Sequence, residues 1–185
     1  MFIQRDLEIR IIDIPEGGQQ VETEIDIVSV ENLLEGAIEV SRVLTPLSLK
    51  CDFVRTGTEI ILDGTYRVDL ELNCIKCLDN FTYGLDEGFH YIYRTVFGKA
   101  EPEDQELKSN DFEIYYCDGE NIDLSSIVRE QIYLNLPQYP YCNEDCLGLC
   151  VYCGENLKKG LCKCLSGKTR ANSPFAVLEK LKDDK

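Results

Sequence analysis

Apolar and polar residues alternate along most of the first hundred positions, which is the pattern of strands that bury one face. Apolar residues at 2–3, 7, 9 and 11 alternate with charged ones, and a second alternating stretch runs over 21–30. Short runs rich in Val, Ile, Leu, Tyr and Thr follow at 36–44, 46–54, 58–62, 65–74 and 81–96. Turn-forming residues separate these runs, so the sequence predicts an antiparallel meander.

The dipeptide Asp63-Gly64 is the strongest turn signal in this region. It lies between the apolar residues at 60–62 and the alternating run that begins at Tyr66. A two-residue type I′ turn needs positive φ at both central positions, which Asp-Gly tolerates. We therefore expect a tight hairpin there.

A helix is predicted over about 123–136. Asp123 can cap it, Pro137 can end it, and most apolar positions between them are spaced by three or four, namely Leu124, Ile127, Val128, Ile132 and Leu136. This apolar stripe is expected to pack against the sheet. A second helix is expected from Pro174 through Phe175, Val177, Leu178 and Leu181 to the end.

These elements predict an α+β fold: mainly an antiparallel β meander or open, barrel-like sheet, with one or two helices and a C-terminal Cys-rich zinc-knuckle segment. We divide the chain into an acidic β-rich body at 1–139, a zinc-knuckle segment at 140–170 and a C-terminal helix at 171–185. Residues 99–111 are polar and acidic and are expected to form a mobile loop beside the sheet.

Charge separates the body from the tail. The 185 residues include 19 Lys and Arg against 34 Asp and Glu, a formal net charge of −15. Residues 140–185 are nevertheless slightly basic, and five cations follow one another there without an intervening acid: Lys158, Lys159, Lys163, Lys168 and Arg170. An acidic body repels a bare phosphate backbone, so only this tail is a candidate RNA contact.

The ten cysteines point to metal rather than to disulfides. The N-terminus carries frequent charges and no apolar leader segment, and no stretch approaches the length of a membrane span. We therefore expect a soluble protein of the reducing cytoplasm, where clustered cysteines more often bind metal. Eight of them form close pairs at 74/77, 142/146, 150/153 and 162/164; Cys51 and Cys117 are expected to be core residues.

The C-terminal pairs predict a structural zinc site. Zinc takes four thiolates at tetrahedral corners, and a C-x-x-C turn supplies two of them. Gly154 directly follows Cys153, where such a turn needs a residue that tolerates positive φ. Our first choice of ligands is Cys150, Cys153, Cys162 and Cys164; Cys142 and Cys146 compete as the second pair, and with Cys74 and Cys77 they permit a second site.

Catalytic interpretations have less support, and we expect no enzyme and no small-molecule substrate. The 146/150/153 spacing matches the iron–sulfur motif of radical enzymes, but too few residues follow it for their barrel. A thioredoxin-like dithiol at 74/77 would need a helix directly afterwards, and the sequence there reads as a strand. The one histidine, His90, lies in an aromatic run and reads as a sheet residue.

The order of these motifs resembles the YceD family of bacteria and plastids. The resemblance rests on the strand that leads into Cys74-x2-Cys77-Leu78, on residues 122–142, on Gly148-Leu149-Cys150-x2-Cys153-Gly154-x-Asn156-Leu157 and on Pro174-Phe175-Ala176-Val177-Leu178. It implies a role in 23S ribosomal RNA accumulation and large-subunit assembly. The expected partner is a basic ribosomal protein or assembly factor that binds the acidic body. Two alternatives stay open: direct RNA binding through the basic tail, and an iron–sulfur or dithiol redox protein.

Overall fold

The computed structural model describes residues 7–95, 114–117, 121–160 and 162–164. The chain forms two compact units. Unit 1 comprises Met1–Leu72 and Thr82–Gln138, and unit 2 comprises Asn73–Phe81 and Tyr139–Lys185. Residues 73–81, which our division of the sequence assigns to the body, therefore group with the Cys-rich segment.

Unit 1 is built on a six-stranded sheet in which β2, β4, β5, β6 and β7 are successive neighbours and β3 pairs with β5. All described pairings are antiparallel except that of β6 with β7, which is parallel. A separate antiparallel pair joins β1 to β8. The strands are β1 (Glu8–Arg10), β2 (Gln19–Ile25), β3 (Val40–Val43), β4 (Leu47–Thr56), β5 (Glu59–Asn73), β6 (Asn80–Thr95), β7 (Ile114–Cys117) and β8 (Asn121–Asp123). The predicted fold class, a mainly antiparallel sheet with helices and a Cys-rich C-terminal region, is confirmed.

One face of this sheet forms the core of unit 1. Along β4 and β5, residues alternate strictly between buried and accessible over most of both strands. Leu47, Leu49, Cys51 and Phe53 of β4 are at most 1% exposed. Removing such side chains from water is the main stabilising term in folding. Cys51 is thus a core residue, as predicted.

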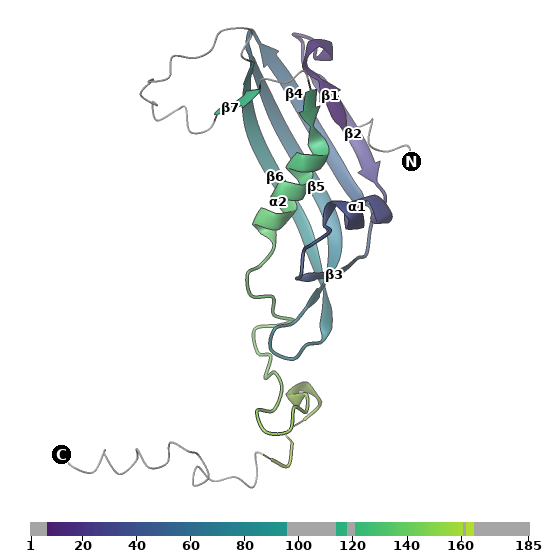
Figure 1. Cartoon of the computed structure of the whole chain (residues 1–185), viewed down its shortest axis with the longest axis vertical. Helices are drawn as coiled ribbons and strands as arrows, with labels where there is room; N and C mark the ends of the chain where they lie inside the picture. The colour runs from purple at the N-terminus through teal and green to yellow at the C-terminus, as the bar shows by residue number, and fades with distance from the viewer. Residues whose placement is uncertain (1–6, 96–113, 118–120, 161, 165–185) are drawn as a thin grey trace, which may run out of the picture. The chain divides into compact units, whose positions relative to one another are not determined.

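Helix α2 (Leu124–Asn135) lies across the buried face of the sheet (Figure 1). The predicted stripe is buried at Leu124, Ile127, Val128 and Ile132, and Asp123 caps the helix. Polar contacts add to this packing: the Tyr66 hydroxyl donates to the Gln131 carbonyl at 3.1 Å and accepts from Asn135 Nδ2 at 3.1 Å. The prediction for this helix is confirmed to within a residue at each end.

The hairpin predicted at Asp63-Gly64 is wrong. Strand β5 continues through both residues, which pair with Asp52 and Cys51 of β4. A Cβ on Gly64 would lie 2.1 Å from the Phe89 ring. Glycine is required here because an aromatic side chain of β6 covers the backbone.

The strand predicted from the alternation over 21–30 is also wrong in its second half, where the chain forms a helix. Strand β2 ends at Ile25, and α1 (Ile27–Leu33) follows, with the Asp26 side chain accepting the Ser29 N–H at 3.1 Å. Asp26 is a strong helix cap, and the apolar positions Val30 and Leu34 are buried. The predicted helix near 174–185 and the loop at 99–111 lie outside the described residues.

Substituting Gly64 tests the contact with Phe89. We expect Gly64→Ala to lower the free energy of unfolding by about 1–3 kcal/mol, since the core has no room for the added carbon. Gly17→Ala is the control, because a Cβ there meets nothing within 4 Å. Urea denaturation of both variants measures the difference. Equal midpoints for the two variants would show that Phe89 moves aside without cost.

The Asp123 cap provides a pH-dependent test. Burial alone raises the pKa of Asp123, but hydrogen bonds from Ser125 and Ser126 outweigh it and lower the pKa below its usual value. Because the pKa is lower in the folded state, the stabilisation is present above about pH 4 and is lost as the pH falls through the folded-state pKa. We expect Asp123→Ala to cost about 1 kcal/mol at pH 7 and less in acid.

The control for that experiment is Asp123→Asn, which keeps an acceptor oxygen but does not titrate. Its effect on stability should be smaller at pH 7. A loss for Asp123→Ala that stays constant from pH 7 to pH 3 would contradict the cap assignment.

Candidate metal centres

Cysteine side chains form the buried core of unit 2. Its buried cluster consists of Cys74, Cys77 and Cys146, against which Phe81 and Cys142 pack. The described parts of the unit, 73–81, 139–160 and 162–164, contain eight cysteines. The positions in which the backbone holds these thiols therefore determine whether this unit can bind metal.

Residues 74–79 form the first cysteine turn. The Leu78 N–H donates to the Cys74 carbonyl at 2.8 Å, and the Cys74 N–H donates to the Asp79 carbonyl at 2.9 Å. Leu78 has a φ of 61°, which is strained for a residue with a side chain. This backbone points both thiols of the C-x-x-C pair to one side.

Residues 150–155 form the second cysteine turn, which has the same hydrogen bonds. The Gly154 N–H donates to the Cys150 carbonyl at 2.8 Å, and the Cys150 N–H donates to the Glu155 carbonyl at 2.8 Å. Gly154 has a φ of 73°. The positive φ expected at Gly154 is thus present, and Leu78 adopts the same conformation without being a glycine.

The first centre comprises Cys74, Cys77, Cys142 and Cys146, whose sulfurs all lie within 4.8 Å of one another. The Sγ atoms of Cys74 and Cys146 are 3.8 Å apart, as are those of Cys77 and Cys142. A tetrahedron with metal–sulfur bonds of about 2.3 Å has edges of about 3.8 Å. The thiols are thus spaced as ligands of one ion and are too far apart for disulfides.

The second centre comprises Cys150, Cys153, Cys162 and Cys164, again with all sulfurs within 4.8 Å. Cys150 and Cys162 are buried, Cys164 is half-buried and Cys153 is exposed. These are the four residues of our first choice, and the competing residues form the other centre. Either set of four sulfurs can hold a metal ion.

The first cysteine of each turn is poised to be a thiolate. Burial raises the pKa of Cys74, but N–H groups of Cys142, Cys77 and Lys76 outweigh burial and lower it to about 6. The N–H groups of Cys153 and Tyr152 lower the pKa of Cys150 to about 7. Burial raises the pKa of Cys77 to about 12, so a metal that binds the first centre must displace protons.

The predicted basic contacts are only partly within the described residues. Lys158 forms an ion pair with Asp79 at 3.6 Å, and Lys159 lies in the same 3-10 turn (Leu157–Lys159). Lys163 lies between two ligands of the second centre. Lys168 and Arg170 lie outside the described residues. Lys158 therefore has a partner within unit 2 itself.

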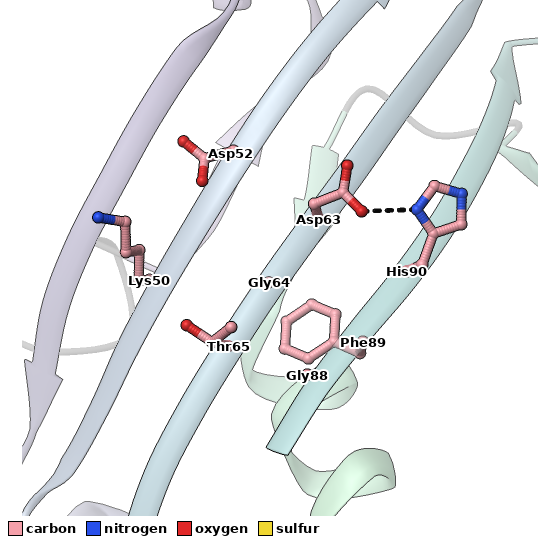
Figure 2. Close-up of a pocket in the computed structure, with 8 residues that line it drawn as sticks. All are labelled: Lys50, Asp52, Asp63, Gly64, Thr65, Gly88, Phe89 and His90. Carbon is pink, nitrogen blue, oxygen red and sulfur yellow. Dashed lines mark hydrogen bonds and ion pairs between the residues drawn. The ribbon is translucent and has the colours of Figure 1, made fainter. Parts of the chain in front are cut away.

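His90 belongs to a shallow hollow on the outer face of the sheet of unit 1, the face opposite α2. Its Nδ1 atom lies 2.7 Å from Asp63 Oδ1, a contact that the dashed line in Figure 2 marks. Both side chains are more than half exposed to water, so this is a surface contact. The hollow is lined by Lys50, Asp52, Asp63, Gly64, Thr65, Gly88, Phe89 and His90. His90 is thus a sheet residue, as predicted.

No helix within the described residues combines the length and the apolar composition needed to cross a membrane.

The fold and the two centres define a class of protein: a mainly antiparallel β-sheet with an attached module of two four-cysteine clusters. A family profile described as "Large ribosomal RNA subunit accumulation protein YceD" matches residues 62–182. This chain therefore belongs to the YceD family. The match begins within β5, so it includes all eight clustered cysteines.

Curated relatives agree with the family assignment. The chain is 25% identical over 154 residues to the chloroplastic "Large ribosomal RNA subunit accumulation protein YCED homolog 1" of Zea mays, covering 71% of this chain and 53% of the relative. It is 24% identical over 160 residues to the protein of the same name in Arabidopsis thaliana, covering 75% and 49%. It is 26% identical over 116 residues to "Uncharacterized protein ML1660" of Mycobacterium leprae (strain TN), covering 60% and 49%.

The chain spans about half the length of these curated relatives. No solved structure matches it.

Metal analysis tests the two ligand sets separately. We expect two metal ions per purified chain, and one after Cys146→Ser or Cys162→Ser, because each serine removes a thiolate from a different centre. Cys51→Ala is the control, since Cys51 lies in the core of unit 1. Elemental analysis gives the counts. A metal content that neither serine variant lowers would contradict both ligand sets.

Proposed function

We propose that this chain is a non-enzymatic ribosome-assembly factor that supports the accumulation of 23S ribosomal RNA and the assembly of the large subunit. Membership of the YceD family is the observation that carries the proposal. The names of the two plant relatives support it. Unit 1 binds a basic ribosomal protein or assembly factor, and unit 2 is a zinc-stabilised module.

The outer face of the sheet is the binding surface that this proposal uses. The register of β2, β4 and β5, with the ion pairs to β6, places acidic residues along the whole face. Lys50, Arg67 and Arg94 of this face each form an ion pair with a neighbouring acid, and Arg42 of β3 lies opposite Glu71. The acidic residues of this face are Glu22, Glu24, Asp52, Glu59, Asp63, Asp69, Glu71 and Asp86. An excess of one charge on a surface accelerates encounter with a partner of opposite charge.

Direct RNA binding has weaker support. Phosphate contacts need accessible cations, and the Lys158 ammonium group already pairs with Asp79. The acidic outer face would repel RNA. We therefore assign the partner as a protein, and RNA binding becomes an outcome of the test below.

Zinc is the metal that this proposal assigns to both centres. Four thiolates at the corners of one tetrahedron form a closed structural site with no position for a substrate. An iron–sulfur cluster places its cysteines on different iron atoms, so their sulfurs lie further apart than those of a single-ion site. The spacing within 4.8 Å favours one ion per centre. Visible absorption of the anaerobically purified protein separates colourless zinc from iron.

Charge reversal on the outer face tests the partner surface. We expect Glu24→Lys with Asp52→Lys to remove the chain from large-subunit precursor particles and to lower 23S ribosomal RNA in cells that depend on the variant. Both side chains are exposed, so the fold should tolerate the change. Sucrose-gradient sedimentation of the tagged full chain, with measurement of 23S RNA, gives the result.

The matched control is Glu35→Lys with Glu39→Lys, which changes the net charge equally at exposed positions between α1 and β3. It should sediment like the wild type. If both double variants stay on the particles, the acidic face is not the binding surface. The tail lysines are Lys158, Lys159, Lys163 and Lys168. If only their replacement by Gln removes the chain from the particles, and that replacement also flattens the salt dependence of particle binding, the chain contacts RNA directly.

A further inference from the structure

The loop that carries the second centre is joined to the first cysteine turn within unit 2. The Leu149 N–H, next to Cys150, donates to the Lys76 carbonyl at 3.1 Å. The approach is so close that a Cβ on Gly148 would lie 2.9 Å from that carbonyl oxygen. Gly148 also has a φ of 73°, so glycine is required on both counts.

Beyond the second cysteine turn, Asn156 and Lys158 contact the same first turn. Asn156 Nδ2 donates to Asp79 Oδ2 at 2.9 Å, and Lys158 Nζ lies 3.6 Å from the same oxygen. The Lys158 N–H donates to Asn156 Oδ1 at 3.0 Å, which fixes the orientation of the amide. Asp79 is thus held by two side chains from the loop of the second centre.

Lys158 also interacts with a ligand of the first centre. The Cys142 side chain is the main cause of the raised pKa of Lys158. A divalent ion with four thiolates carries a net charge of −2, which a nearby cation stabilises. The first centre therefore takes a stabilising cation from the segment that carries the other centre.

That segment depends on its own metal for order. Among its described residues between 150 and 164, the buried ones are Cys150 and Cys162. Its large apolar residues face water, with Val151 88% and Tyr152 57% exposed. A loop without an apolar core is ordered by the metal that its ligands bind.

We propose that Asn156 and Lys158 couple the two centres, so that metal bound at the first centre slows the release of metal from the second. The coupling rests on the proposed zinc sites. Thermodynamic linkage makes the effect on affinity reciprocal. Asn156 and Lys158 are positioning residues that act through Asp79 and Cys142. The second centre, with Cys153 exposed, is the one that exchanges first.

Zinc-release kinetics test the proposal. The full zinc-loaded chain is mixed with a coloured chelator, and we expect a fast and a slow phase of one zinc each. The fast phase is release from the second centre while the first is still occupied, so Lys158→Met and Asn156→Ala should accelerate this phase about tenfold or more, the range in which outer-shell partners affect metal sites. Lys158→Arg should keep the fast phase close to its wild-type rate. Lys159→Met, a change of the same type one residue away, should match the wild type.

A second variant examines the coupling from the other side. Cys146→Ser removes a ligand of the first centre alone, so the chain should retain one zinc, at the second centre, that leaves about tenfold faster than the fast phase of the wild type. If that zinc leaves at the wild-type fast rate, the coupling is refuted while the zinc assignment stands. A wild-type chain that binds no zinc refutes both. Neither result bears on the ribosomal role, which is measured separately by sedimentation.

Discussion

The convergence of eight thiols is the constraint on which unit 2 depends. The Cys74 and Cys146 sulfurs, 72 positions apart in sequence, lie 3.8 Å apart. Cys77 and Cys142 meet at the same distance across 65 positions. The described residues of unit 2 offer little buried apolar area besides these sulfurs, and a small unit without an apolar core needs another source of stability. Bonds from thiolate to a metal ion would provide one, and both sets of four sulfurs are spaced to hold such an ion.

Chain connectivity explains how the first of these turns is placed. Strand β5 ends at Asn73 and β6 begins at Asn80, so the first cysteine turn is the connection between the two longest strands of the sheet. Strand β5 runs through Gly64 without a turn, and the Phe89 ring covers that glycine. Gly64, which led us to predict a hairpin, thus lies within a single strand that runs from Glu59 to Asn73.

The sequence predicts what periodicity and ligand chemistry control. Alternation indicated β4 and β6, the three-to-four spacing with Asp123 and Pro137 predicted α2, and the cysteine pairs predicted clusters suited to a metal. It fails where tertiary contacts override local preference. The dipeptide Asp63-Gly64 is typical of a turn, and only the contact of Gly64 with Phe89 explains why it lies within a strand. The β-branched residues of α1 favour a strand, although the Asp26 cap could have indicated the helix.

Which pairs of cysteines meet is likewise a question of topology. Spacing favoured the 150/153 and 162/164 pairs but left 142/146 and 74/77 as competitors or as a second site. The β5–β6 connection is what brings the 74/77 pair to the 142/146 pair. The positive φ of Leu78 has no signal in its residue type, although its position directly after a C-x-x-C pair matches that of Gly154.

The central claim is that metal–thiolate bonds, rather than apolar packing, hold unit 2 together while unit 1 folds on its own core. Amide hydrogen exchange of the full chain, before and after metal removal by a chelator under reducing conditions, tests it directly. We expect protected amides at 73–81, 139–160 and 162–164 to lose their protection, including those of Leu78 and Gly154. Amides of β4, β5 up to Leu72, and α2 should keep theirs. Unchanged protection of both cysteine turns in the metal-free chain would contradict the account.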